Sequence, residues 1–150
     1  MKRILLRVLA WVTFISIVFY ILFTRHFSMV LVIGDSMDPH MEDKELIIMH
    51  RTYEEWTPQR YDVVVVWDEA DKDKMVKRII GLPNEKISLS DKDIYLDGEK
   101  LRRDYWHVDG NYVDEEIKVP EGYVWVIGDN RRYSWYGLIP IKDILGRVLF

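Results

Sequence analysis

The sequence predicts a mainly β domain carried on one N-terminal membrane-spanning helix. Residues 4–23 are nearly all apolar, and such a run is typical of a helix that crosses a bilayer. Beyond residue 28, short runs rich in β-branched and aromatic residues alternate with turn residues, as in β-strands. The 150 residues leave room for one domain of ordinary size, and the 49% hydrophobic content excludes a wholly disordered chain.

The apolar segment Ile4–Phe23 would extend about 30 Å as a helix, which is the thickness of a bilayer core. A cleaved signal peptide is one alternative, but neither Ala10 nor Ala70, the only alanines, lies in an Ala-x-Ala cleavage site. A helix buried in a soluble core is another, and it leaves the basic residues at both ends unexplained. We therefore favour an uncleaved anchor.

The basic residues around this segment predict its orientation. Lys2, Arg3 and Arg7 lie at its start and Arg25 alone follows it, which favours a cytoplasmic N-terminus. Residues 1–25 would then form the cytoplasmic N-terminus and transmembrane anchor. Residues 26–150 would form an extracytoplasmic domain of a single-pass protein of the cell membrane, with the lipid bilayer as a partner.

The charge and the metal-binding residue types narrow the function classes. Residues 26–150 hold 17 of the 21 basic and all 25 acidic side chains, a net charge of −8, which argues against a nucleic-acid partner. The lack of cysteine excludes disulfides and thiol chemistry without identifying the compartment. The four histidines show no metal-ligand spacing, so we expect no metal and no other cofactor. Two of them, His40 and His50, are interpreted as surface or packing residues.

The predicted strands follow one another along the domain and are separated by turn residues. Asp97-Gly98 lies between two strand-like runs and predicts a two-residue hairpin. Asp68–Lys74 is interpreted as a loop or hairpin connection and Arg102–Glu116 as a longer excursion. The predicted strands are Val30–Ile33, Leu46–Met49, Val63–Trp67, Met75–Ile80, Ile87–Leu89, Ile94–Leu96, Tyr123–Ile127 and Ile144–Phe150.

Ser36 lies in the turn-like segment Gly34–Pro39, directly after a predicted strand. Glycine and proline here favour a tight turn that exposes backbone N–H groups beside the hydroxyl, as a nucleophile with an oxyanion hole requires. The plainer alternative is an ordinary turn with a solvated serine. A serine becomes a nucleophile only when a nearby base takes its proton.

Lys77 lies inside the apolar strand pattern Met75–Ile80. Alternation places Met75, Lys77 and Ile79 on one face and Arg78 on the other, where we expect a charged surface or structural group. Burial among apolar neighbours would favour the neutral amine, which can act as a base. The alternative is an exposed strand lysine.

A third segment, Gly128–Ser134, follows the predicted strand Tyr123–Ile127 and by itself indicates only a turn. The ordered set of motifs is more specific. An anchor is followed by Gly-Asp-Ser-Met-x-Pro, a Val-Val-Val-Val-Trp strand, Lys-Arg-Ile-Ile-Gly-Leu-Pro and Gly-Asp-Asn-Arg-x-x-Ser. This set resembles bacterial type I signal peptidases, the leader peptidase family of membrane-bound Ser/Lys endopeptidases, over almost the whole chain.

The resemblance implies an antiparallel β-sheet catalytic domain of the signal-peptidase and LexA-like type. Ser36 would attack the scissile carbonyl, Lys77 would act as general base, and Ser134 would orient the lysine amine, with Asp129 as a further supporting residue. The backbone N–H of Ser36 would be one oxyanion donor. The substrates would be preproteins that carry signal peptides, with small residues at the first and third positions before the cut, and Val30, Val32 and Met37 are candidates to line the pockets.

The chain departs from the family pattern in its last motif, because Ser134 runs directly into Trp135-Tyr136-Gly137 where the family continues with Asp-Ser-Arg. Glycine at position 34 also cannot supply the hydroxyl that some members use as an oxyanion donor. Besides a general signal peptidase, we weigh a specialised relative for pilin or surface proteins, a catalytically silent scaffold and a self-cleaving LexA-like repressor. We expect the protein to be a monomer.

Overall fold

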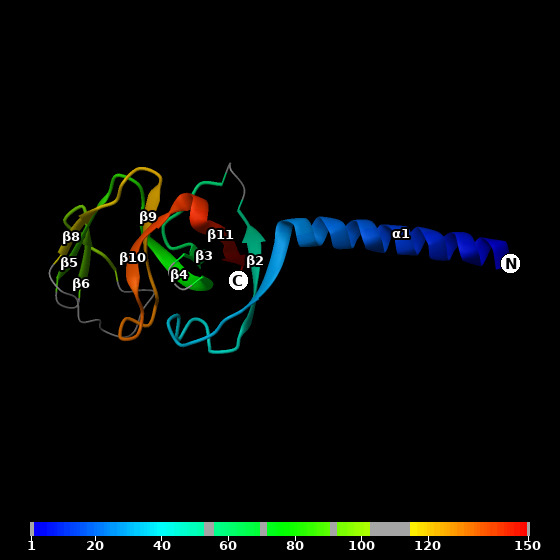
Figure 1. Ribbon diagram of the computed structural model, residues 1–150, viewed down its shortest axis with the longest axis horizontal. Coiled ribbons are helices and arrows are strands. Elements are labelled where there is room, and N and C mark those ends of the chain that lie inside the picture. Colours follow the sequence, from blue (N-terminus) through cyan, green and yellow to red (C-terminus); the bar gives the residue numbers. More distant parts are fainter. Residues whose placement is uncertain (1, 53–55, 70–71, 91–92, 103–114, 150) are drawn as a thin grey trace.

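The computed structural model describes residues 2–52, 56–69, 72–90, 93–102 and 115–149. One long helix projects from a domain made of two β-sheets (Figure 1). The elements are α1 Lys2–His26, β1 Phe27–Leu31, β2 Leu46–Arg51, β3 Val63–Asp68, β4 Asp73–Gly81, β5 Lys86–Ser90, β6 Asp93–Leu96, β7 Glu99–Lys100, β8 Glu115–Lys118, β9 Tyr123–Ile127, β10 Tyr136–Pro140, the 3₁₀ turn η1 Ile141–Asp143 and β11 Ile144–Leu149.

Helix α1 is long and apolar enough to cross a membrane, and none of its residues is buried against the domain. The hydroxyls of Thr13 and Thr24 donate hydrogen bonds to the carbonyls of Leu9 and Tyr20, so the helix backbone satisfies both polar groups. Strand β1 begins at Phe27, directly after the helix ends at His26. The helix and the domain are therefore joined without a linker.

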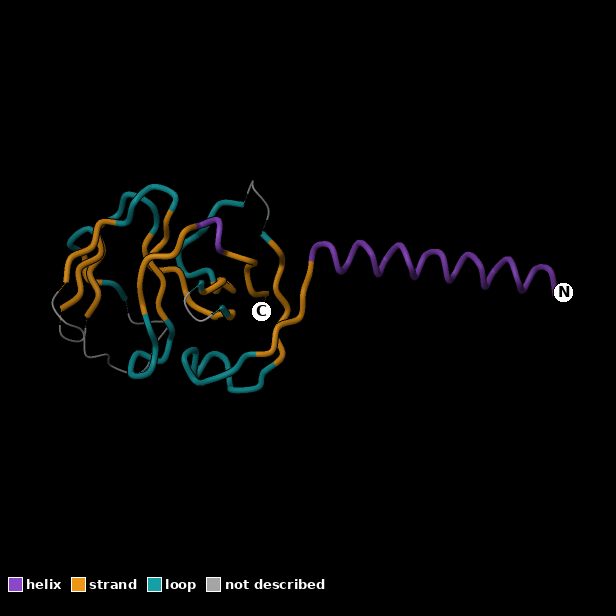
Figure 2. Tube along the Cα trace, in the orientation of Figure 1, coloured by secondary structure: helices purple, strands orange, loops and turns teal. Residues whose placement is uncertain are grey.

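The larger sheet carries the core of the domain. Its seven strands have the order β1-β2-β11-β3-β4-β9-β10, and every pair is antiparallel. Figure 2 shows these strands spread between the end of the helix and the group of strands at the opposite end of the domain. A register shift between Ile79 and Gly81 interrupts the β4–β9 pairing. In this strand order β4 lies between β3 and β9, away from both edges of the sheet. A lysine on β4 can therefore be buried.

The smaller sheet has the order β7-β6-β5-β8 and lies at the end of the domain away from α1 (Figure 1). Its hairpin between β6 and β7 turns at Asp97 and Gly98, whose φ angles are 49° and 86°. The two-residue hairpin predicted from Asp-Gly is therefore confirmed. Ile87 and Ile94 bury their side chains against Trp125 of the larger sheet, which joins the two sheets through one apolar cluster.

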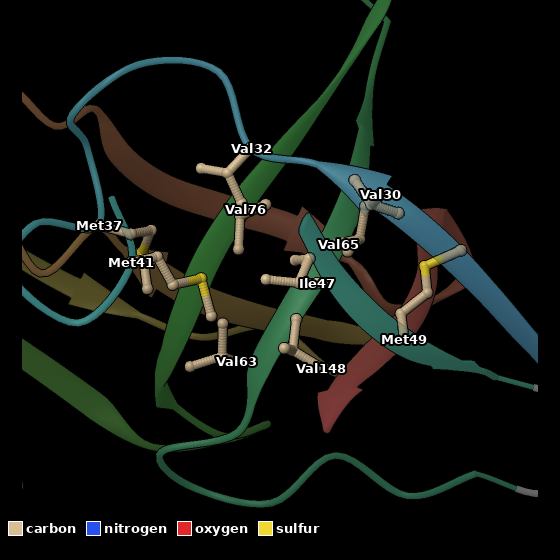
Figure 3. Packing of buried hydrophobic residues seen from close by; sticks show 10 residues of the cluster. All are labelled: Val30, Val32, Met37, Met41, Ile47, Met49, Val63, Val65, Val76 and Val148. Atoms are coloured by element: carbon tan, nitrogen blue, oxygen red, sulfur yellow. The ribbon is translucent and has the colours of Figure 1, made fainter. Parts of the chain in front are cut away.

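A second apolar cluster lies inside the curve of the larger sheet, and it holds the loop that carries Ser36 (Figure 3). β-Branched residues dominate the strands that form it, because they pack well on a pleated surface. Met37 and Met41 reach into the cluster from the loop and are 0% and 1% exposed. The cluster consists of Val30, Val32, Met37, Met41, Ile47, Met49, Val63, Val65, Val76 and Val148.

The structure confirms a mainly β domain behind one apolar helix, and each predicted strand overlaps an observed one. Two strands were missed. β10 contains Gly137 and Pro140, which disfavour a strand by composition. β8 is short and charged, and only its pairing with β5 defines it. Most of the predicted excursion over residues 102–116, including His107, lies outside the described residues.

Candidate active site

Ser36 lies on the loop between β1 and β2, and hydrogen bonds close that loop at its base. Gly34 has a φ of +92°, and its N–H donates to Asp43 Oδ1 at 2.8 Å. Lys44 N–H donates to the Val32 carbonyl at 2.9 Å, so the two arms of the loop run side by side. Together with the buried Met37, these contacts fix the position of the serine although its loop is at the surface.

Lys77 is buried in β4 and reaches the serine. Its partner on the neighbouring strand β3 is Val64, and Lys77 is 4% exposed. The Lys77 amine lies 2.9 Å from Ser36 Oγ. The interpretation of Lys77 as an exposed strand lysine is therefore wrong.

Burial also changes the acidity of this lysine. Desolvation lowers the pKa of Lys77 from 10.5 to about 8, and the Asp129 carboxylate opposes part of that shift by stabilising the ammonium form. A substantial fraction of Lys77 is then neutral in mildly alkaline solution. A neutral amine at hydrogen-bond distance from a hydroxyl can take its proton.

Arg78 and Asp129 form a buried ion pair beside the lysine. Arg78 Nε and one terminal nitrogen donate to the two Asp129 oxygens at 2.8 and 2.6 Å, and a second terminal nitrogen donates to the Tyr61 carbonyl at 3.0 Å. Of the two roles expected for Arg78, surface or structural, the structure shows the structural one. His40 Nδ1 lies 3.2 Å from the same carboxylate.

The loop after β9 packs tightly against the nucleophile. A Cβ on Gly128 would lie 2.2 Å from the Ser36 carbonyl oxygen and 2.1 Å from Ser134 Oγ, so only glycine fits there. Asn130 N–H donates to the Ser36 carbonyl at 3.1 Å. This backbone contact is a second constraint on the serine, supplied by a segment distant in sequence.

Ser134 lies at the site, but its hydroxyl is used by the backbone. It accepts a hydrogen bond from Gly128 N–H at 2.8 Å and lies 2.9 Å from the Trp135 carbonyl, to which it donates. The hydrogen bond that the structure gives the Lys77 amine goes to Ser36. The predicted orienting of the lysine by Ser134 stays a prediction.

A groove of about 330 Å³ leads to the Ser36–Lys77 pair, lined by residues 29–33, 73–77 and Ser36. Within the described sheet, β1 pairs only with β2, and β9 pairs with β4 only from Arg78 onward. The backbones on both sides of the groove therefore have edges without a strand partner. Of the three residues expected to line the substrate pockets, Val30 and Val32 line this groove, whereas Met37 is fully buried in the core.

Sequence reasoning placed Ser36, Lys77, Asp129 and Ser134 together, and the structure brings all four to one site. It missed the contact between His40 and Asp129 and the tight packing of Gly128. The residue types carry no signal for either, because each contact joins loops that only the folded sheet brings together.

Comparisons with known proteins identify the family. The sequence profile of "Signal peptidase, peptidase S26" matches residues 5–150. The chain is 32% identical to signal peptidase I of Bacillus caldolyticus over 142 residues, covering 83% of this chain and 78% of that protein. It is 29% identical to signal peptidase IB of Staphylococcus aureus strain COL, covering 95% of this chain and 88% of that protein.

The fold is also similar to that of a solved structure. The crystal structure of a signal peptidase I from Enterococcus faecalis V583 superimposes with a TM-score of 0.54 at 29% identity, covering 63% of this chain and 98% of that one. The protein belongs to the peptidase S26 family of signal peptidases.

Proposed function

We propose that this protein is a membrane-bound serine endopeptidase that removes N-terminal signal peptides from exported preproteins. The observation that carries the proposal is the 2.9 Å distance between the Ser36 hydroxyl and the buried amine of Lys77 at the end of an open groove. Family membership and the names of the relatives support the same activity.

The geometry supports a two-step reaction. Neutral Lys77 takes the proton of Ser36 as Oγ attacks the scissile carbonyl, and the ammonium then gives that proton to the leaving amine. The ester on Ser36 holds the signal peptide, and the mature protein leaves as the amine. Lys77 next takes a proton from water as the water oxygen attacks the ester carbonyl. The ammonium returns that proton to Ser36 Oγ, which releases the signal peptide as a free acid. The Ser36 N–H is the proposed donor to the oxyanion.

The groove suggests how the substrate lies. An extended peptide placed between residues 29–33 and 73–77 can hydrogen-bond to both open edges, as an added strand does. Val30 and Val32 are buried at 9% and 4% exposure, so they leave little depth for a substrate side chain. A shallow apolar wall favours small residues such as alanine near the cut.

We further propose that residues 1–25 place the N-terminus in the cytoplasm and residues 26–150 on the outer side of the membrane. The excess of basic residues before the apolar segment supports this orientation. A protease-protection assay on sealed vesicles tests it. Protection of the domain in inside-out vesicles and its digestion in right-side-out vesicles is the expected pattern.

The activity is tested with a preprotein that carries an Ala-x-Ala site and the full chain solubilised in detergent. We expect cleavage after the last alanine, read by mass spectrometry of the new N-terminus, and its loss in Ser36→Ala. Ser90→Ala, in an exposed position of β5, is the matched control and should cleave normally. Cleavage that persists in Ser36→Ala refutes the proposed nucleophile. If folded wild-type protein cleaves no preprotein in a panel that includes pilins and surface proteins, the proposal of signal-peptide cleavage is refuted.

A further inference from the structure

His40 connects the loop that carries the nucleophile with the charge pair beside the base. Its N–H donates to the Met37 carbonyl at 2.9 Å, which fixes it to the turn that follows Ser36. Its Nδ1 lies 3.2 Å from Asp129 Oδ2. One short side chain therefore joins the nucleophile loop to the loop after β9.

Asp129 is shared among several positive groups. Its carboxylate is fully buried and holds Arg78 through both oxygens. It also raises the pKa of Lys77, because a buried negative charge stabilises the nearby ammonium. A further positive charge on the same carboxylate weakens its hold on that ammonium, so the charge of His40 acts on the base through Asp129.

His40 is open to solvent, unlike its partners. Its side chain is 31% exposed, whereas those of Asp129 and Arg78 are 0% and 5% exposed. It lines two open hollows at the surface. Imidazole is the side chain that ordinarily changes its charge between about pH 5 and 8.

The other charged groups around His40 are carboxylates, guanidinium groups and an ammonium group, which ordinarily keep their charge in that range. Among the described residues, one hollow brings Arg60, Asp62, Arg78 and Arg147 to its walls. The other brings Glu42, Asp43, Lys44 and Glu45. Among these described side chains, the imidazole of His40 is therefore of the type that ordinarily changes its charge in this range.

We propose that His40 is a positioning residue for Lys77, which by gaining a proton weakens the hold of Asp129 on the lysine ammonium and so keeps the base active at lower pH. This inference rests on the proposed function, because it concerns the same site. It assigns to His40 a role that its interpretation as a surface or packing residue did not include.

The test compares wild type with His40→Asn in the full chain solubilised in detergent. The asparagine amide can occupy the place of Nδ1 and donate to Asp129, but it does not titrate. We measure kcat/KM for preprotein cleavage from pH 5.5 to 9. The ratio of kcat/KM at pH 6 to that at pH 8.5 should be about threefold lower in His40→Asn, which corresponds to a coupling of about half a pKa unit.

The matched control is His50→Asn, because His50 lies on β2 and contacts Phe27 rather than the charge pair. It should reproduce the wild-type profile. Superimposable profiles for wild type and His40→Asn overturn the inference, and so does an equal change in His50→Asn.

A second readout is independent of cleavage. Coupling between two charges is reciprocal, so a charged Lys77 opposes the protonation of His40 to the same extent. The ring ¹³Cε1 resonance of His40, assigned by its loss in His40→Asn, is followed from pH 5 to 9 in wild type and in Lys77→Met. We expect the midpoint to lie about half a pKa unit lower in wild type than in Lys77→Met. Equal midpoints overturn the inference. If wild type cleaves no preprotein while the two midpoints differ, the proposed function fails and the role of His40 stands.

Discussion

Replacing Lys77 by methionine should abolish turnover and yet stabilise the fold at neutral pH. The residue is 4% exposed, and its burial lowers the pKa from 10.5 to about 8. Because folding prefers the neutral amine, the ammonium present at pH 7 destabilises the native state. A shift of this size corresponds to about 3 kcal/mol.

Methionine has a similar length and carries no charge, so it removes this cost. It also loses the 2.9 Å contact with Ser36, a hydrogen bond that contributes about 1 kcal/mol. We therefore expect Lys77→Met to be about 2 kcal/mol more stable than wild type at pH 7. The free energy of unfolding of the wild type increases as the pH rises from about 8 to 10.5. Over that range the lysine of the unfolded chain still binds the proton that the lysine of the folded chain has lost.

The assay is urea unfolding of the detergent-solubilised chain, followed by tryptophan fluorescence at pH 7 and above pH 10.5. The extra stability of Lys77→Met should be present at pH 7 and absent above pH 10.5. Lys142→Met, at an exposed position, is the matched control and should change stability by less than about 0.5 kcal/mol at either pH. A Lys77→Met variant that is less stable than wild type at pH 7, or equally stabilised at both pH values, refutes the reasoning.

Three further outcomes follow from the site. The kcat/KM of the wild type should rise with pH and level off above about pH 8, because only neutral Lys77 can act as base, and a pH–rate profile checks this. Ser134→Ala should lower kcat about five- to tenfold, the effect of losing one hydrogen bond to Gly128, without moving the midpoint of that profile. Asp129→Asn should cost about 3 to 5 kcal/mol in urea unfolding, because it leaves Arg78 buried without its carboxylate.

These outcomes have their own controls. A midpoint displaced in Ser134→Ala would mean that this hydroxyl acts on the lysine amine rather than on the backbone. For Asp129→Asn, the comparison is Glu85→Gln, which breaks the more exposed pair with Arg60. If Glu85→Gln lowers the free energy of unfolding as much as Asp129→Asn does, burial of the ion pair is not the cause of the lost stability.

The sequence alone determined the architecture because its strand signals are local. Runs such as Val63–Trp67 and the Asp97-Gly98 turn each encode their conformation in neighbouring residues, and the apolar helix is recognised by length and composition. Strand β10 was not predicted, because Gly137 and Pro140 give no such signal. Its pairing with β9 defines it as a strand.

The sequence also determined which residues carry the chemistry, through the order and spacing of its motifs. It did not determine their contacts. Ser36, Lys77 and Asp129 meet only because β1, β4 and the loop after β9 converge in the folded sheet. That convergence supplies the burial that makes Lys77 a base, directs the Ser134 hydroxyl to Gly128, and places His40 against Asp129. Desolvation and long-range charge pairing are properties of the packed molecule, so only the tertiary structure could decide them.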